Sequence, residues 1–382
     1  MKICIVVPWV LSNKQLIPSK MSCGSSGAEE TLINLTTILE KNGATTNIYY
    51  NGLRTEEYAF GANWLNLERL NRFSYYDAVI IWNDYRETLE PLMPKLPKAK
   101  CFYVRFVNQL EQNEFNWLAT SFDIVLSQSE WLIKKYSVNS ANIMLCRNGI
   151  NAEEYSCDNH HYMRSSNTFI YGSEYDRGLL YLLKIWPIVT AVNPQFKLKV
   201  FHGWDVFDSK MKRLKPESSG YGEMLRFKTY MTHLLTTTYG VKELGRVSHT
   251  DVINLARRSR ALLYPCLFPE NCSTLSLKVQ AAGCDIVAIS SGGLVETLAK
   301  NCTRTREILW STNSLHQDGN SERALSEFTK LLEVYLQGPV IFHHNKEVEE
   351  FINLHAYTNV FRPLLASLKR ISLVGEMKRI AK

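Results

Sequence analysis

The chain has 382 residues, of which 45% are hydrophobic and 21% charged, an ordinary globular composition that excludes disordered, collagen-like and low-complexity proteins. This length favours two domains over a single core. The 44 basic and 37 acidic residues give a net charge of +7, which favours anionic partners such as nucleotides, phosphates or a lipid surface without choosing among them.

Several other classes of protein are disfavoured by the distribution of residues. No apolar run reaches the roughly 18 residues of a membrane span. The opening run is short and contains Pro8, so it predicts a first strand and not a signal peptide, and we expect a cytoplasmic protein. The nine cysteines form no C-x-x-C pair and are interpreted as core residues. No zinc finger or RNA-binding signature is present, so nucleic acid is not an expected partner.

Apolar and β-branched runs alternate with helix-like segments in the first part of the chain. The runs are Ile3–Val7, Thr45–Tyr50, Ala78–Trp82, Cys101–Val104, Ile124–Leu126 and Ile143–Leu145. This alternation is typical of a parallel sheet wound with crossover helices.

The first loop of this series is rich in small residues. It ends in Gly24-Ser25-Ser26-Gly27, and the expected helix after it places Leu32, Leu35 and Leu39 toward the sheet before it ends at Asn42-Gly43. Glycines allow close approach of a ligand, and a helix N-terminus favours an anion. The loop is neither G-x-G-x-x-G nor a P-loop, so an ordinary loop with a helix cap is an equal alternative.

A second series of strands and helices follows a polar linker at 153–167. Its expected strands are Thr168–Tyr171, Phe196–Phe201, Val241–Leu244, Ala261–Tyr264 and Asp285–Ile289. The sequence therefore predicts two doubly wound α/β domains. We place the first at 1–160 together with a C-terminal helix at 361–382, and the second at 161–360.

Two loops of the second series carry polar residues suited to ligands. In the first, Arg177 stands at a helix start, where a guanidinium can pair with a diphosphate; a surface pair with Asp176 is the alternative. In the second, a strand ends at Pro265, the loop presents Glu270, and Ser273 is expected to cap a helix that stops at Gly283. Such loops suit a ligand that has both hydroxyls and phosphates.

The tail predicts one more helix. Its apolar stripe consists of Phe361, Leu364, Leu365, Leu368 and Ile371. Its other side carries Arg362, Lys369, Arg370, Lys378, Arg379 and Lys382, a basic face that suits either solvent or an anionic lipid surface.

Four segments together resemble a known family. They are Gly27-Ala28-Glu29, Asn148-Gly149-Ile150, Tyr171 to Leu179 and Pro269 to Gly283, in the family's order. On these segments the chain resembles the retaining glycosyltransferases of family 4 (glycosyl transferases group 1). The resemblance covers about residues 20–300. It implies the GT-B fold, with two Rossmann-like doubly wound parallel-sheet domains facing a cleft and a C-terminal helix that crosses back to the first domain.

The resemblance also implies roles for individual residues. Glu270 would bind hydroxyls of the transferred sugar as the catalytic candidate, and Arg177 would pair with the donor diphosphate. The other donor-binding candidates are Gly27, Ser173, Val247, Asn271, Cys272, Ser273, Thr274 and Lys278. The family is usually metal-independent and the chain has no D-x-D in a plausible place, so no metal and no other cofactor are expected. The first-domain loops 11–23 and 54–63 are expected to vary with the acceptor.

Three positions depart from the family's pattern. Lys278 stands where the family has a second glutamate that binds ribose, and Ser173 or Glu174 replaces a frequent arginine. The segment with Arg105 and Asn108 lacks a frequent first-domain histidine. These departures support an alternative in which the protein binds a nucleotide sugar or glycan without catalysis, as a partner subunit. A GT-B-fold epimerase is a third interpretation.

The sequence thus predicts a retaining hexosyltransferase. Its donor would be a UDP- or GDP-sugar, and its acceptor a hydroxyl of a glycan, a protein or a lipid. We expect it in the cytoplasm, with contact to a membrane surface as an additional expectation from the basic tail.

Overall fold

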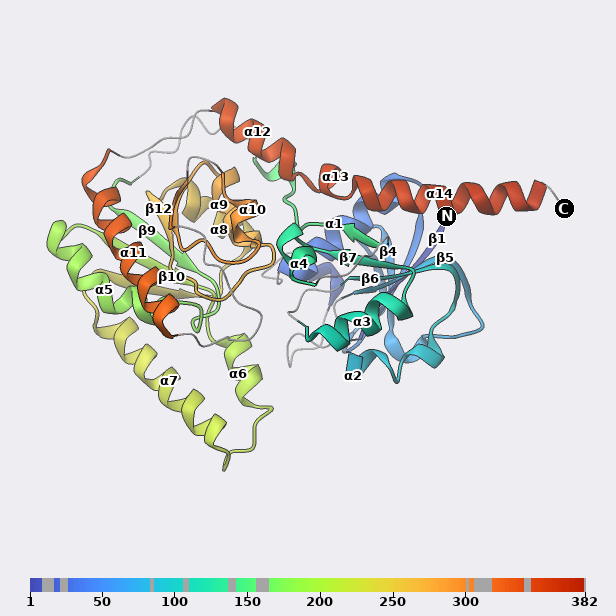
Figure 1. Ribbon diagram of the computed structural model, residues 1–382, viewed down its shortest axis with the longest axis horizontal. Coiled ribbons are helices and arrows are strands. Elements are labelled where there is room, and N and C mark those ends of the chain that lie inside the picture. The colour runs from blue at the N-terminus through green and yellow to red at the C-terminus, as the bar shows by residue number, and fades with distance from the viewer. Residues whose placement is uncertain are drawn as a thin grey trace. The chain divides into compact units, whose positions relative to one another are not determined.

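The chain divides into two compact units, each built on one sheet flanked by helices (Figure 1). A computed structural model describes residues 1–8, 17–20, 27–82, 86–105, 110–136, 142–155, 165–299, 302–305, 318–339 and 345–380. The first unit comprises Met1–Asn151 and Leu354–Lys382, and the second comprises Ala152–Asn353. The α/β class with two Rossmann-like parallel sheets is confirmed.

The sheet of the first unit has eight strands in the order β3-β4-β2-β1-β5-β6-β7-β8. The strands are β1 (Lys2–Val7), β2 (Thr45–Tyr50), β3 (Glu57–Ala59), β4 (Ala62–Asn66), β5 (Tyr75–Trp82), β6 (Lys98–Arg105), β7 (Ile124–Ser127) and β8 (Ile143–Leu145). All neighbours are parallel except β3 and β4. All six strands predicted for this unit are present.

The prediction of a loop at 54–63 is wrong. This segment contains β3 and the start of β4, which pair as an antiparallel hairpin with Ala59 opposite Ala62. The two residues between them, Phe60 and Gly61, have φ of 50° and 75°, the conformation of a two-residue hairpin turn. Much of the other predicted variable loop, 11–16 and 21–23, lies outside the described residues.

Helices cover both faces of the first sheet. They are α1 (Gly27–Lys41), α2 (Arg86–Leu89), α3 (Gln112–Ser121), α4 (Glu130–Lys135), α13 (Tyr357–Val360) and α14 (Arg362–Ile380), with short 3₁₀ turns at Pro18–Lys20, Leu67–Arg69 and Met93–Lys95. The core on one face joins α1 to α14, and the core on the other joins α2, α3 and α4. The predicted apolar stripe Leu32, Leu35 and Leu39 of α1 is buried in the first core, as expected.

The predicted C-terminal helix packs on the first unit. The side chains of Phe361, Leu364 and Leu368 are fully buried in the same core as α1, and α14 contacts β5 and β8. The chain enters this helix through an isolated parallel bridge between Ile150 and Ala356. The last helix is therefore an integral part of the first unit, although it follows the whole second unit in sequence.

We expect Leu368→Ala to lower the free energy of unfolding by about 2–5 kcal/mol, because a fully buried leucine leaves a cavity. The matched control is Lys369→Ala on the same helix, whose exposed side chain predicts a change within about 0.5 kcal/mol. Denaturant unfolding of both variants measures the difference. Equal stabilities would contradict the packing of α14.

The sheet of the second unit is parallel, with six strands in the order β11-β10-β9-β12-β13-β14. They are β9 (Thr168–Gly172), β10 (Lys197–Phe201), β11 (Val241–Gly245), β12 (Ala261–Tyr264), β13 (Asp285–Ala288) and β14 (Thr303–Arg304). The five predicted strands are confirmed, and β14 was missed. From β9 the strands that follow in sequence are added on one side up to β11 and then, from β12, on the other side. The place between β9 and β12 is therefore a topological switch point, and ligands of such sheets bind there at the carboxyl ends of the strands.

The helices of the second unit also cover both faces. They are α5 (Leu179–Val192), α6 (Asp205–Met211), α7 (Ser219–Thr237), α8 (His249–Arg257), α9 (Thr274–Ala281), α10 (Leu294–Thr297) and α11 (Asp318–Gln337), with a 3₁₀ turn at Ala152–Tyr155; α12 (Asn345–His355) leads back to the first unit. α5 contacts α7 and α11, and α9 contacts α8 and α10. The seven cysteines within the described residues are free and buried, which confirms their interpretation as core residues.

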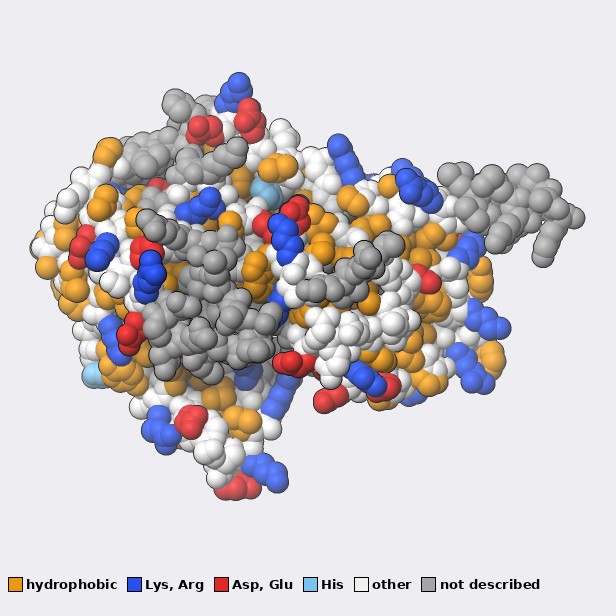
Figure 2. Space-filling view, in the orientation of Figure 1, with side chains coloured by type: hydrophobic (Ala, Val, Ile, Leu, Met, Phe, Trp, Pro, Cys, Tyr) orange, Lys and Arg blue, Asp and Glu red, His pale blue; other side chains and the backbone are white. Residues whose placement is uncertain are grey.

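The charged side chains show no concentration on the face drawn in Figure 2. Lysines and arginines are spread over it, several of them beside acidic side chains. Among the described residues, no helix combines the length and the apolar character that crossing a membrane requires.

Candidate functional site

Three neighbouring strands of the second sheet end in unusual backbone conformations. Ser173 follows β9 with φ of 149°, His202 follows β10 with φ of 121°, and Gly245 ends β11 with φ of 66°. Positive φ strains residues that have a side chain, and such strain persists mainly at functional sites. The carboxyl edge of this sheet is therefore the candidate place for a ligand site.

Glu270 lies in the loop after β12, at the switch point. Its backbone is fixed, because its carbonyl accepts a hydrogen bond from the Gly293 amide at 2.5 Å and it forms an isolated bridge with Gly292. A Cβ on Gly292, which has φ of 62°, would lie 2.6 Å from the Glu270 carbonyl oxygen. The loop is thus closely packed against the turn that precedes α10.

The Glu270 carboxylate is held through one of its two oxygens. Oε1 accepts hydrogen bonds from the Tyr264 hydroxyl at 2.7 Å and from Arg177 Nη1 at 2.7 Å, and a weak one from Cys266 Sγ at 4.0 Å. Among the described residues, no group donates a hydrogen bond to Oε2. The side chain is 13% exposed, so the carboxylate presents one oriented acceptor at the edge of the sheet.

Arg177 comes from the turn between β9 and α5, and its side chain is 25% exposed. The guanidinium stacks on the Phe268 ring, 4.3 Å from its centroid. Burial opposes its charge, but Glu270, with Tyr264 and Cys266, outweighs burial and raises the pKa of Arg177 above its usual value. The alternative of a surface pair with Asp176 is wrong, because Asp176 lies near Lys210 at 3.6 Å instead.

The Arg177 turn depends on Gly178, which precedes α5 with φ of 95°. A Cβ there would lie 2.1 Å from the Pro265 carbonyl oxygen, so the turn and the Glu270 loop are packed backbone to backbone. This contact explains how residues 93 positions apart come to form an ion pair.

Gly178→Ala is expected to lower the free energy of unfolding by about 3 kcal/mol or more, because the backbone must move as well as adopt a strained φ. Gly245→Ala is the control: its φ is 66° but a Cβ would meet nothing within 4 Å, so it should cost about 1 kcal/mol. Thermal and denaturant unfolding measure both. A smaller loss for Gly178→Ala than for Gly245→Ala would contradict the close packing of the two loops.

The segment after Glu270 forms the start of α9. The Ser273 hydroxyl accepts a hydrogen bond from the Ser276 amide at 3.3 Å, which confirms the predicted cap. The side chains of Asn271, Cys272 and Ser273 are buried, and that of Thr274 is half-buried. The predicted donor-binding residues 271–274 thus lie next to Glu270 at a helix N-terminus.

Lys278 lies within α9 and is only 4% exposed. Its ammonium lies against Nδ1 of His249, the first residue of α8. Burial, then the charges of Lys278 and Arg246, lower the pKa of His249 to about 3, so the imidazole is neutral at pH 7 and its Nδ1 can accept a hydrogen bond from the lysine ammonium. The Lys278 side chain is therefore held inside the second unit and is not solvated.

The two remaining predicted residues lie apart from this cluster in sequence. Val247 is half-buried in the turn between β11 and α8, two residues before His249. Gly27 is the first residue of α1 in the first unit, and the loop residues 21–26 before it lie outside the described part of the chain. The second unit therefore brings together Glu270, Arg177 and the start of α9, a group called the Glu270 cluster below.

The carboxyl edge of the first sheet carries a buried arginine. Arg105 ends β6 with no exposed surface, donates to Asn148 Oδ1 at 2.6 Å and stacks over the Trp82 ring at 4.2 Å. Thr31 donates to the same Asn148 oxygen at 3.2 Å. Arg105 thus holds the turn at Asn148 in place, and Asn108 lies outside the described residues.

Sequence reasoning missed Tyr264 and His249 as parts of the site. The sequence pattern places Tyr264 at the end of a predicted strand and gives no indication of a role for His249. The only signal for Tyr264 was its place as the last residue of a strand at the switch point, a position that favours ligands over core packing.

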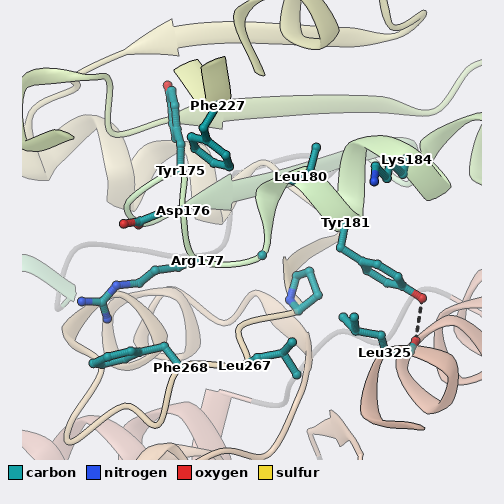
Figure 3. A pocket seen from close by; sticks show the side chains of 12 residues that line it. Tyr175, Asp176, Arg177, Leu180, Tyr181, Lys184, Phe227, Leu267, Phe268 and Leu325 are labelled. Carbon is teal, nitrogen blue, oxygen red and sulfur yellow. Dashed lines mark hydrogen bonds between the residues drawn. The ribbon is translucent and has the colours of Figure 1, made fainter. Parts of the chain in front are cut away.

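A cavity of about 350 Å³ lies beside Arg177, which forms part of its wall (Figure 3). Leu180, Tyr181, Phe227, Leu267 and Leu325 give it mainly apolar walls. In Figure 3 the Arg177 side chain extends over Phe268, away from Tyr181, which binds α11. Of the residues predicted to bind the donor, Arg177 alone lines this cavity, so we assign the site to the Glu270 cluster and not to the cavity.

Comparison with known proteins adds to this geometry. No family model matches the chain, and no curated protein matches its sequence. Solved structures do match. A glycosyltransferase from Rickettsia africae ESF-5 aligns with a TM-score of 0.64 at 14% identity, over 97% of this chain and 98% of that one. Sucrose-phosphate synthase from Thermosynechococcus elongatus aligns with a TM-score of 0.64 at 12% identity, over 100% of both chains.

HepE from Anabaena in complex with UDP-glucose also matches, with a TM-score of 0.61 at 13% identity, over 97% of this chain and 100% of that one. The chain has the GT-B fold. At these identities the likeness shows the fold alone. That fold agrees with the two sheets of the chain and with the return of α14 to the first unit. Within this GT-B protein, the Glu270 cluster occupies the switch point of the second sheet.

Proposed function

We propose that the protein is a glycosyltransferase that moves a hexose from a nucleoside diphosphate sugar to a hydroxyl of a glycan, protein or lipid, with retention of configuration. The observation that carries the proposal is the Glu270 carboxylate, held through Oε1 by Arg177 and Tyr264 at the switch point of a GT-B protein. The GT-B protein HepE, in complex with UDP-glucose, supports this class of donor.

The residues of the site suit the two chemical parts of such a donor. A carboxylate accepts hydrogen bonds from sugar hydroxyls, and Oε2 of Glu270 is open to them among the described groups. A guanidinium matches the geometry of phosphate oxygens, and the N-terminus of α9 adds a positive dipole end beside it. The proposal includes no metal and no other cofactor, because these groups would supply the positive charge.

The reaction exchanges one bond at the anomeric carbon. The bond to the diphosphate oxygen breaks, the acceptor oxygen takes its place, and the acceptor's proton leaves to the departing diphosphate or to water. Arg177 would stabilise the charge that develops on the diphosphate, and Glu270 would hold the sugar ring in position. With a lipid acceptor, the exposed basic side chains Arg362, Lys369 and Arg370 of α14 are where an anionic membrane surface would contact the protein.

The test is to incubate the protein with UDP-glucose and with GDP-mannose in EDTA, with glycan and lipid acceptors, and to follow the sugars by NMR. The proposal predicts release of nucleoside diphosphate and a new glycoside with the donor's anomeric configuration. An isomerised donor would indicate the epimerase instead. Binding without any reaction would favour the partner-subunit alternative, and no binding of either donor would contradict the proposal.

A further inference from the structure

Tyr264 is the last residue of β12, and its side chain is 2% exposed. Its ring lies against the ring of Tyr171 on the neighbouring strand β9, with 6.5 Å between the centroids. Its carbonyl oxygen accepts a hydrogen bond from the Ile289 amide at 3.1 Å. A side chain held in this way has little freedom, so its hydroxyl has a fixed place at the switch point.

The proton of this hydroxyl can be assigned by chemistry. The Tyr264 oxygen lies 2.7 Å from Glu270 Oε1 and 3.4 Å from Ser173 Oγ. A phenol has one proton, and an ionised carboxylate can only accept, so Tyr264 donates to Glu270 while the Ser173 hydroxyl can donate to Tyr264. Burial, followed by Cys266 and Glu270, raises the pKa of Tyr264 well above its usual value, so the phenol keeps this proton.

Arg177 and Tyr264 hold the same carboxylate oxygen but differ in mobility. Arg177 is on a turn and 25% exposed, whereas Tyr264 is in the centre of the sheet and 2% exposed. When a diphosphate binds, the guanidinium has a second anion to contact and can leave Oε1. The other acceptor near the Tyr264 hydroxyl is the neutral Ser173 oxygen, at 3.4 Å against 2.7 Å for the carboxylate, so the hydrogen bond to Glu270 is the stronger one and persists.

We propose that Tyr264 is a positioning residue that keeps Oε1 of Glu270 occupied, so that Oε2 is presented to the hydroxyls of the donor sugar throughout donor binding. The inference rests on the proposed function and deepens it. Packing alone does not require the hydroxyl, because a phenylalanine would fill the same space at the end of the apolar strand Ala261–Tyr264.

The test compares the dissociation constants of UDP-glucose and UDP for Tyr264→Phe, with GDP-mannose and GDP as a second pair. The variant should bind the nucleotide sugar about ten-fold more weakly and the free nucleotide as the wild type does, because only the sugar contacts Glu270. The ratio of the two constants is insensitive to a loss of folded protein. Tyr335→Phe is the control, since this buried tyrosine of the same unit bonds the Arg260 carbonyl at 3.5 Å and should keep the wild-type ratio.

A double-mutant cycle with Glu270→Gln shows whether Tyr264 acts through Glu270. In the Glu270→Gln background, Tyr264→Phe should change the ratio by less than two-fold, whereas independent roles would give additive effects. An unchanged ratio in the single variant, or additivity in the cycle, would overturn the role of Tyr264 and leave the proposed function standing. If the wild type binds neither nucleotide sugar, or binds each no better than its free nucleotide, the proposed function fails and this inference with it.

Discussion

Glu270→Gln is expected to lower turnover of the nucleotide sugar by about 10- to 100-fold while leaving the affinity for free nucleotide nearly unchanged. The substitution keeps the size of the side chain but removes the charge that strengthens hydrogen bonds from sugar hydroxyls. Free nucleotide lacks the sugar and so does not report on this contact. Steady-state kinetics with UDP-glucose and calorimetry with UDP measure the two quantities.

Glu223→Gln is the matched control, because Glu223 is an exposed glutamate on α7 of the same unit. It should leave both turnover and affinity at wild-type values. If Glu270→Gln reacts as fast as the wild type, Glu270 does not hold the donor sugar. If it loses affinity for UDP as much as for UDP-glucose, Glu270 instead supports the nucleotide.

Arg177→Ala is expected to weaken UDP and UDP-glucose alike, by about 1.5–3 kcal/mol, because both ligands carry the diphosphate that the guanidinium would meet. Arg177→Lys keeps the charge but not the planar fork of the guanidinium. Its affinities should therefore lie between those of the wild type and those of Arg177→Ala. Calorimetry in EDTA measures all of these affinities.

Arg226→Ala serves as the control for net charge, because Arg226 is exposed on α7. It should change neither affinity beyond the small effect of long-range charge. Unchanged binding in Arg177→Ala would contradict the role of Arg177. Loss of binding by the wild type in EDTA would contradict the metal-free site.

The parallel strands were predictable because buried strands of α/β sheets are nearly continuous apolar runs, as in Ile3–Val7 and Ala261–Tyr264. The hairpin β3–β4 was not, since its strands have only three and five residues and its turn places Phe60 at a positive φ that few such residues adopt. The strand β14 has only two residues, too few for any periodic signal.

The candidate site was predictable where a residue type and a strand end coincide, as for Glu270 and Arg177. The direct pairing of these two side chains was not, because it depends on the backbone contact between Gly178 and Pro265. The partner of Lys278 was equally hidden, since His249 comes 29 residues earlier on another helix. Tertiary packing, which leaves no local pattern, decides such contacts.

The Lys278–His249 pair bears on whether the site works. A lysine cannot accept a hydrogen bond from ribose, but its ammonium is already engaged by the neutral imidazole within the protein. Lys278, which stands where the family has a glutamate, therefore forms a buried pair with His249. It is compatible with a donor site whose sugar and diphosphate contacts come from Glu270 and Arg177.

The central claim is that the second unit holds a nucleotide sugar through its diphosphate and its sugar at the same time. Calorimetric titration of the full chain with UDP-glucose and GDP-mannose, each beside its free nucleotide and in EDTA, tests this most directly. We expect one site that binds one of the nucleotide sugars more tightly than the corresponding nucleotide. Absence of binding, or equal affinity for the sugar-bearing and sugar-free ligands, would contradict it.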